Sequence, residues 1–269
     1  MDVNKVLYIS QEIEPYLAAD SMSTFGKELP QGIQERGAEV RTFMPKYGAI
    51  NERRNQLHEV IRLSGLNIVI DDTDHPLIIK VATLQPSRMQ VYFIDNDDYF
   101  MRSASGELET VHDAAANDER SIFFVRGTAE TVKKLRWDPS VVHCTGWITA
   151  LMPLYLRTIY SDQPTFKNCK IVYSLFNSPF DGVLDSRMIE KLKEDGFTDE
   201  QLQSLESDGK PVDYIKLNKL AIDYADGIAI SSDNIEQELI DYAKASGKPV
   251  LDYTGSIDVD AYKQFYLSL

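Results

Sequence analysis

The chain has 269 residues, of which 43% are hydrophobic, and a chain of this size can bury one large core or two modest ones. With 28 basic and 42 acidic residues its formal net charge is −14 at pH 7, which disfavours nucleic acids and anionic membranes as primary partners, because both bind clustered Lys and Arg. Two cysteines, no recognisable signal peptide and no apolar stretch long enough to cross a bilayer predict a cytoplasmic protein.

The first predicted elements form a strand–helix–strand unit. Lys5–Ser10 is short, β-branched and nearly all apolar, which is typical of a buried parallel strand. Apolar residues then recur at helical spacing from Met22 to Ile33, and Glu39–Met44 forms the next strand. This order predicts a parallel sheet with right-handed crossovers.

The loop between the first strand and the first helix is the first candidate for a ligand site. In an open α/β sheet such a loop faces the ligand crevice, with a helix N-terminus aimed into it. A phosphate-binding loop would carry glycines, so that backbone amides could approach the anion. Residues 18–21 instead read Ala-Ala-Asp-Ser.

The pattern then changes to short strands without helices between them. Four β-rich runs follow, at 57–63, 66–70, 77–84 and 90–94. They predict an antiparallel meander or hairpin inserted in the sheet, or lying at its edge, near 57–94. Residues 95–116 read as a polar loop, and its tip at 103–106 is a candidate for a mobile flap.

Regular alternation of helices and strands resumes after this insertion. Helices are predicted near 122–132, 148–155, 214–224 and 235–242, strands at 141–142, 170–175 and 227–230, and short charged helices within 181–212. The tail from Lys248 onward has weak structure signals. The fold class is therefore α/β, with a Rossmann-like, mostly parallel sheet and helices on both faces.

His143, Thr145 and Trp147 stand where a strand ends and a helix begins, and such positions line the ligand crevice of a parallel sheet. The alternative is that His143 is a hydrogen-bonded core histidine and Trp147 packs the helix. Asp95–Asp98 resembles the start of a calcium loop but lacks its glycine and late glutamate, so a solvated acidic turn is the better interpretation. The sequence contains no metal-ligand set, nucleophile elbow or Walker loop.

Several segments, in order, resemble the N-terminal catalytic domain of bacterial glycogen synthases and plant starch synthases. They are Ser10–Pro15, Asn117–Phe124, Val142–Leu151, Lys219–Gly227 and Gly255–Asp258. The resemblance implies a GT-B glycosyltransferase, in which two Rossmann-like domains transfer glucose from ADP-glucose to the non-reducing end of an α-1,4-glucan. It also implies that residues 1–269 form a single N-terminal-type domain, the acceptor side, without the C-terminal nucleotide-binding domain.

The chain departs from this family at the positions that carry its chemistry. Replaced family positions are Ala18 (Lys), Asp20 and Ser21 (both Gly), Thr145 and Gly146 (His-Asp), and Phe176 (His). The resemblance therefore implies no catalytic residue, no cofactor and no family-like binding of ADP-glucose. The domain alone is expected to be inactive.

Other polar and aromatic residues of the family segments are retained or remain near the crevice. These ligand-crevice candidates are Glu12, Asp20, Asn117, Asp118, His143, Trp147 and Asn177. Asn117 or Asp118 is also expected to cap the helix that follows.

Three functions remain open at this point. The chain could be one half of a split enzyme completed by a partner that carries the nucleotide domain. It could be a non-catalytic module that binds α-glucan or another sugar and regulates glycogen enzymes. It could be a scaffold that associates with itself or with a protein partner through the face left by the missing domain.

Overall fold

A computed structural model of the chain describes residues 3–100, 116–206 and 209–269. Its strands are β1 (Lys5–Ser10), β2 (Glu39–Pro45), β3 (His58–Glu59), β4 (Leu66–Ile70), β5 (Thr73–Leu84), β6 (Met89–Asp95), β7 (Val141–Thr145), β8 (Lys170–Leu175), β9 (Gly227–Ile230) and β10 (Val250–Leu251). Its longer helices are α1 (Ser21–Glu35), α4 (Asn117–Leu135), α8 (Tyr214–Tyr224), α9 (Gln237–Ala245) and α10 (Val259–Ser268). Shorter helices are α2 (Asp97–Phe100), the 3-10 turn η2 (Trp147–Thr149), α5 (Met152–Arg157), α6 (Met188–Glu194) and α7 (Asp199–Glu206).

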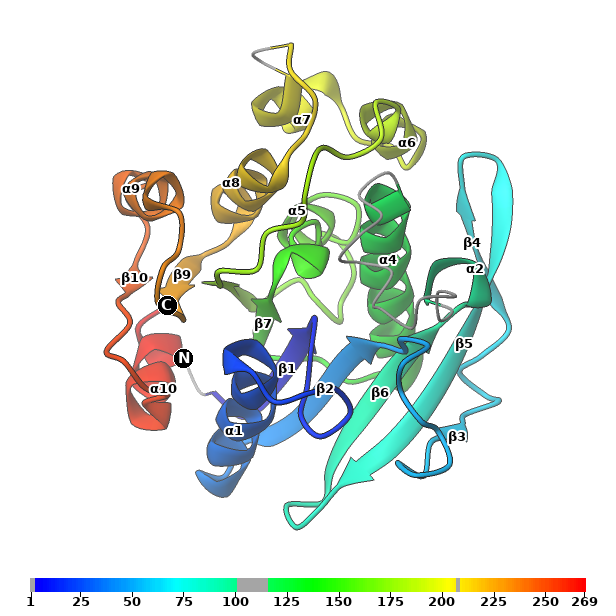
Figure 1. Cartoon of the computed structure of the whole chain (residues 1–269), viewed down its shortest axis with the longest axis vertical. Coiled ribbons are helices and arrows are strands. Elements are labelled where there is room, and N and C mark those ends of the chain that lie inside the picture. The colour runs from blue at the N-terminus through cyan, green and yellow to red at the C-terminus, as the bar shows by residue number, and fades with distance from the viewer. Residues whose placement is uncertain (1–2, 101–115, 207–208) are drawn as a thin grey trace.

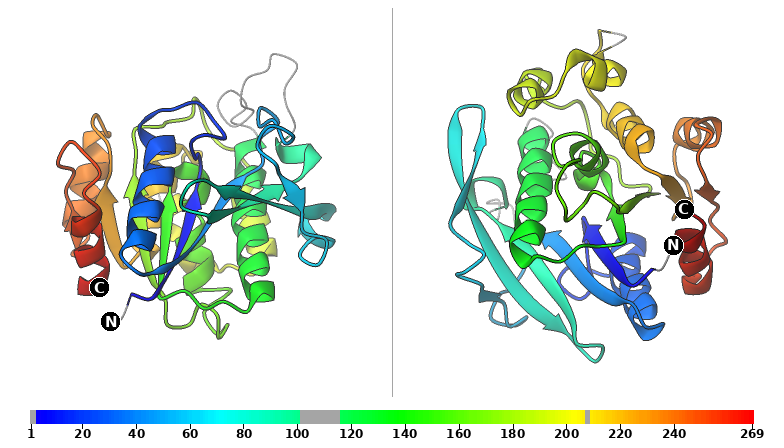
Figure 2. Two further views of the ribbon diagram at one scale, coloured as in Figure 1. Left: turned by 90° about the horizontal axis from the view of Figure 1, so that it is seen from below. Right: turned by 180° about the vertical axis from the view of Figure 1, so that it is seen from behind.

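One sheet organises these elements, in the order β10-β9-β8-β7-β1-β2-β6-β5-β3, with β4 paired to β5 (Figure 1). The pairs from β10 to β6 are parallel, and the pairs that involve β5 are antiparallel. Helices cover both faces of the sheet (Figure 2). On one face Phe25 of α1 packs against His143, and on the other the Tyr173 hydroxyl donates a hydrogen bond to Asn218 Oδ1 of α8. The predicted α/β fold is confirmed.

The β-rich region at 57–94 contains the predicted antiparallel strands, but their boundaries differ from those of the four predicted runs. β4 matches the predicted run at 66–70, whereas the run at 57–63 contributes only the two residues of β3. β6 pairs in parallel with β2 and so belongs to the main sheet rather than to the insertion. The β4–β5 hairpin extends from the sheet edge in Figure 1.

Two predictions about irregular segments need correction or fall outside the structure. The loop predicted at 95–116 begins with the helix α2, where Asn96 accepts a hydrogen bond from the Asp98 backbone N–H. The flap predicted at 103–106 lies outside the described residues. Both cysteines are buried and free, and no helix among the described residues is long and apolar enough to cross a membrane.

The tail from Lys248 onward has only weak structure signals in the sequence, yet it forms the strand β10 and the helix α10. Asp258 caps α10 by accepting a hydrogen bond from the Ala261 backbone N–H, and Tyr262 and Tyr266 are buried. The helix packs against α1 at Gly32, where an added Cβ would lie 2.6 Å from Val259 Cγ2. α10 therefore closes one face of the sheet over its central strands.

Candidate functional site

The loop between β1 and α1 ends in a capping box. The Asp20 carboxylate accepts a hydrogen bond of 2.7 Å from the Ser23 backbone N–H, and the Asp20 backbone N–H donates one of 2.9 Å to Ser23 Oγ. Such a cap is worth about 1 kcal/mol to the helix. A phosphate-binding loop would direct the N-terminus of this helix at its ligand. Here the Asp20 side chain occupies the N-terminus of α1.

Glu12 lies beside this cap. Burial, with a smaller contribution from the neighbouring charge of Asp20, raises the pKa of Glu12 to about 7. Gln11 Nε2 donates a hydrogen bond of 3.3 Å to Glu12 Oε1. The structure thus brings together two of the predicted crevice residues, and both are carboxylic acids.

Gly146 closes the other side of the loop. Its φ of 85° lies in the left-handed region, and an added Cβ would lie 2.7 Å from Gln11 Cβ and 3.1 Å from Met22 Sδ. The close packing leaves no room for an aspartate at position 146, which is one of the two positions where the resemblance implies a histidine–aspartate pair. The preceding Thr145 is fully buried.

His143 is fully buried beneath α10, and both of its ring nitrogens are occupied. Nδ1 lies 2.5 Å from the Tyr266 hydroxyl oxygen, and Nε2 lies 2.6 Å from Ser174 Oγ. Burial lowers the pKa of His143 to about 3, so the imidazole is neutral at physiological pH. The structure therefore places this crevice candidate in the core, as in the alternative interpretation of the sequence.

The hydrogen bonds of His143 extend into a buried network across three neighbouring strands. The Tyr266 and Tyr8 hydroxyls lie 3.1 Å apart, and Ser231 Oγ donates to Ser174 Oγ at 2.9 Å and lies 2.8 Å from the Tyr262 hydroxyl. Strands β1, β7 and β8, the residue after β9, and helix α10 each contribute to this network. It joins the last described helix to the centre of the sheet.

Phe176, at a position where the resemblance implies a histidine, completes an aromatic cluster next to this network. The ring of Phe25 packs at 5.1 Å from that of Phe176, at 5.4 Å from that of Tyr262 and at 5.8 Å from that of His143. A cavity of about 40 Å³ remains beside Ser231, which has room for water but not for a sugar. Aromatic side chains thus fill the space at these strand ends.

Trp147 and Asn177 lie on the two segments that leave β7 and β8. Trp147 is buried in η2 and packs edge-to-face on Phe180, with ring centroids 4.9 Å apart. Asn177 is exposed, and its backbone N–H donates to Ser232 Oγ at 2.9 Å. Of these two candidates, only Asn177 presents its side chain to solvent.

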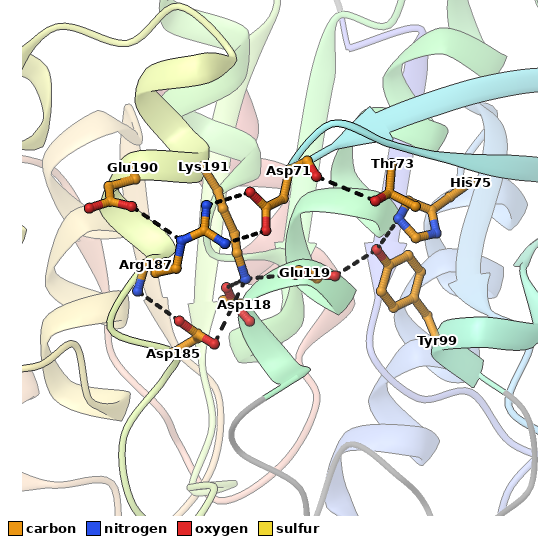
Figure 3. Close-up of polar contacts among 10 residues, drawn as sticks. All are labelled: Asp71, Thr73, His75, Tyr99, Asp118, Glu119, Asp185, Arg187, Glu190 and Lys191. Atoms are coloured by element: carbon orange, nitrogen blue, oxygen red, sulfur yellow. Dashed lines mark hydrogen bonds and ion pairs between the residues drawn. The ribbon is translucent and has the colours of Figure 1, made fainter.

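Asn117 and Asp118 lie at the start of α4, in a separate polar cluster (Figure 3). Both are fully buried, and neither caps the helix, since the capping position is Ala116; the prediction of a cap was wrong. Asp118 Oδ2 pairs with Lys191 Nζ of α6 at 2.8 Å, and Glu119 Oε1 pairs with the same ammonium at 2.6 Å. Burial raises the pKa of Asp118, although the positive charge of Lys191 acts to lower it.

The cluster extends from Glu119 to the inserted hairpin. The Tyr99 hydroxyl donates to Glu119 Oε2 at 2.8 Å and lies 2.8 Å from His75 Nε2 (Figure 3). Arg187 of the same region forms a bidentate pair with Asp71 at the hairpin turn. These contacts tie the β4–β5 hairpin to α4 and α6, so Asp118 and Lys191 belong to a structural junction of charged groups.

Comparisons with known proteins agree with this architecture. A family model described as the starch synthase catalytic domain matches residues 5–251. A glycogen synthase of Chlorobaculum parvum is 36% identical over 236 residues, covering 87% of this chain and 47% of the relative. A glycogen synthase of Chlorobium luteolum is 39% identical over 189 residues, covering 70% of this chain and 39% of the relative. The chain thus spans less than half the length of these curated relatives.

A solved structure shares the fold. The catalytic domain of starch synthase IV from Arabidopsis thaliana, bound to ADP and acarbose, superposes with a TM-score of 0.75 at 18% identity. The match covers 97% of this chain and 53% of that one. The resemblance found in the sequence is thereby confirmed, and the chain belongs to the starch synthase catalytic domain family, together with the bacterial glycogen synthases it matches.

Proposed function

We propose that this chain serves α-glucan metabolism, as glycogen and starch synthases do, and that the domain by itself neither binds ADP-glucose nor transfers glucose. The observation that carries the proposal is the filling of the crevice by the side chains of the chain itself. Asp20 occupies the N-terminus of α1, and Phe176 packs into an aromatic cluster over β7 and β8.

Electrostatics support the proposal that the chain does not bind the nucleotide sugar. A helix N-terminus stabilises an anion by roughly 0.3–1 kcal/mol. A carboxylate about 4 Å from a phosphate charge costs about 4 kcal/mol at an effective dielectric constant of about 20. Asp20 supplies such a carboxylate, and Ala18 replaces the family lysine that would have opposed it. The repulsion outweighs the attraction of the helix.

Packing supports the same conclusion. The relative of known structure was solved with ADP and acarbose bound, and this chain would need space for a comparable ligand at the strand ends. Phe25, Phe176 and Tyr262 occupy that region and are buried. Opening it would expose these rings to water, at about 25 cal/mol for each Å² of apolar surface.

A transfer assay tests the proposal. The chain is incubated with ADP-glucose carrying a radioactive glucose and with glycogen, and incorporation into the polymer is counted. The glycogen synthase of Chlorobaculum parvum is the positive control. We expect incorporation at the level of the protein-free blank, and incorporation that grows with the concentration of this chain would contradict the proposal.

A further inference from the structure

His75 of the β4–β5 hairpin is buried against helices α2 and α4. Its ring centroid lies 4.7 Å from that of Tyr99 and 6.5 Å from that of Phe123. Both ring nitrogens have polar neighbours on α2. Nδ1 lies 3.2 Å from Asp98 Oδ2, and Nε2 lies 2.8 Å from the Tyr99 hydroxyl oxygen, a contact drawn in Figure 3. This histidine is therefore the point where the inserted hairpin meets α2.

A second contact of Tyr99 decides which atom carries the hydrogen between Tyr99 and His75. The Tyr99 hydroxyl donates to Glu119 Oε2 at 2.8 Å. Glu119 is held in the ionised form by Lys191, whose Nζ lies 2.6 Å from Glu119 Oε1, and an ionised carboxylate only accepts hydrogen bonds. Because a tyrosine hydroxyl has one hydrogen to donate, Nε2 of His75 must supply the hydrogen of its contact with Tyr99.

Asp98 makes the same demand of the other ring nitrogen. The Asp98 side chain is 64% exposed, so it is ionised at neutral pH and only accepts. The contact between Asp98 and Nδ1 therefore requires a hydrogen on Nδ1. With hydrogens on both nitrogens the ring is an imidazolium, and only this charged form makes all three contacts at once.

A neutral ring of His75 has to give up one of the contacts. With its hydrogen on Nδ1, the Tyr99 hydroxyl must turn away from Glu119, whose side chain is only 25% exposed. With its hydrogen on Nε2, the ring loses only Asp98, whose carboxylate is open to water. Depriving a buried group of its partner costs more than freeing an exposed carboxylate, so loss of the proton releases Asp98.

Opposite charges surround the ring while the hairpin is closed. The groups that face it, directly or through the Tyr99 hydroxyl, are Asp98 and Tyr99 of α2, Glu119 and Phe123 of α4, Ile68 of β4 and Lys191 of α6. The ammonium of Lys191 pairs with Glu119 and not with the ring. On β5 itself the neighbouring Asp74 is exposed, because successive side chains of a strand point to opposite faces. Carboxylates on two sides thus complement an imidazolium.

We propose that His75 is a pH switch that fastens the β4–β5 hairpin to helix α2. In acid the imidazolium bonds both Asp98 and Tyr99, and in alkali the neutral ring releases Asp98. Histidine ordinarily changes charge between pH 5 and pH 8, so the switch acts in that interval. Because the closed hairpin offers the proton more partners than the opened hairpin, the added protection is complete at low pH and is lost as the pH rises.

Hydrogen exchange of the full chain tests the switch, followed by NMR at pH 5.5 and pH 8 and corrected for the intrinsic exchange rates. The readout is the protection of the Ile68 and Ile70 amides of β4, which pair with β5 beside His75. We expect about two- to fivefold more protection at pH 5.5, the effect of one partly exposed ion pair. His75→Gln keeps a donor for Tyr99 but takes up no charge, and it should abolish this difference.

The matched control is His58→Gln, an exposed histidine of β3 that pairs with the same strand β5, and it should keep the wild-type difference. All other titratable groups are common to the compared chains. Equal protection of the wild-type hairpin at both pH values, a difference that survives His75→Gln, or a difference lost in His58→Gln would overturn the proposal.

A second variant keeps the test decisive if His75→Gln does not fold, as judged by its thermal unfolding. Asp98→Asn removes the exposed carboxylate and leaves the buried ring in place, and it should also abolish the pH difference. A difference that survives Asp98→Asn would count equally against the switch. The proposal does not depend on the proposed function, since neither nucleotide sugar nor glucan enters the measurement.

Discussion

The Tyr266 hydroxyl of α10 lies 2.5 Å from Nδ1 of His143 in the central strand β7, although 123 residues separate the two in sequence. This contact makes the C-terminal helix part of the core rather than an appendage. It also explains why His143, which the sequence places at a strand end but the structure places in the middle of β7, is closed off from solvent. The same helix covers the aromatic cluster around Phe176.

The first prediction concerns the protonation of His143. Burial lowers the pKa of His143 to about 3 in the folded chain, below the value of about 6.5 expected in the unfolded chain. The unfolded chain therefore takes up the proton first as pH falls. The contribution of His143 to stability is complete above pH 6.5 and decreases as pH falls toward 3, by at most about 5 kcal/mol.

NMR of the imidazole measures this directly. The His143 ring signals should stay constant between pH 8 and pH 5 in the folded protein and titrate near pH 6.5 in urea. A titration near neutrality in the folded state would mean that the ring is accessible to water, and the buried network would be wrong.

A second prediction concerns Glu12. The pKa of Glu12 is raised to about 7 in the fold, above its ordinary value of 4.5, so the folded chain binds a proton between these values that the unfolded chain does not. Ionised Glu12 therefore lowers the free energy of unfolding above pH 7. This destabilisation disappears as the pH falls to 4.5, because Glu12 becomes protonated in the folded chain. Glu12→Gln should therefore raise the free energy of unfolding at pH 8 more than at pH 5.

Urea unfolding at the two pH values gives that difference. Glu28→Gln, on the exposed side of α1, is the matched control and should shift both values equally. Equal effects of Glu12→Gln at pH 8 and pH 5 would show that Glu12 is not buried beside Asp20.

A third prediction tests the capping box. Asp20→Ala should lower the free energy of unfolding by about 1 kcal/mol, because the Ser23 backbone N–H loses its acceptor. Asp20→Asn keeps an acceptor at the cap and should change stability by only a few tenths of a kcal/mol. The two variants are compared by chemical unfolding at pH 7. A loss as large for asparagine as for alanine would indicate that the charge of Asp20, rather than the cap, is what the fold needs.

A fourth prediction concerns the buried ion pair of Lys191. Lys191→Met leaves the Asp118 and Glu119 carboxylates without their ammonium and should destabilise the chain by about 3–5 kcal/mol. The matched control is Lys193→Met on the exposed side of α6, with an expected loss of at most about 1 kcal/mol. Thermal and chemical unfolding measure both. Similar losses in the two variants would contradict the buried placement of Lys191.

The local elements of the fold could be predicted from the sequence because their signals are local. The strand at Lys5–Ser10 and the run at 66–70 match β1 and β4, and the helical spacing from Met22 to Ile33 marks α1. The alternation of strands and helices gave the parallel sheet. Asp20 stands directly before the helical run, where an acid is a capping signal, and it caps α1 in the structure.

The site depended on contacts between distant residues, which local patterns do not encode. Phe25 lies within the helical run predicted from Met22 to Ile33, but nothing in the sequence indicates that its ring contacts that of Phe176. Tyr262 and Tyr266 stand in a tail whose weak helical signal is overridden by burial on the sheet. Lys191 belongs to a charged segment, where a solvated lysine is the usual expectation, and only the fold brings it to Asp118.

The central claim is that the crevice no longer accepts ADP-glucose, and calorimetric titration of the chain with ADP-glucose tests it most directly. Titration of the Chlorobaculum parvum glycogen synthase under the same conditions provides the reference. Asp20 and the aromatic cluster around Phe176 predict no saturable heat with this chain up to millimolar ADP-glucose. Saturable binding with a micromolar dissociation constant, lost on Phe176→Ala or changed by Asp20→Asn, would contradict the account.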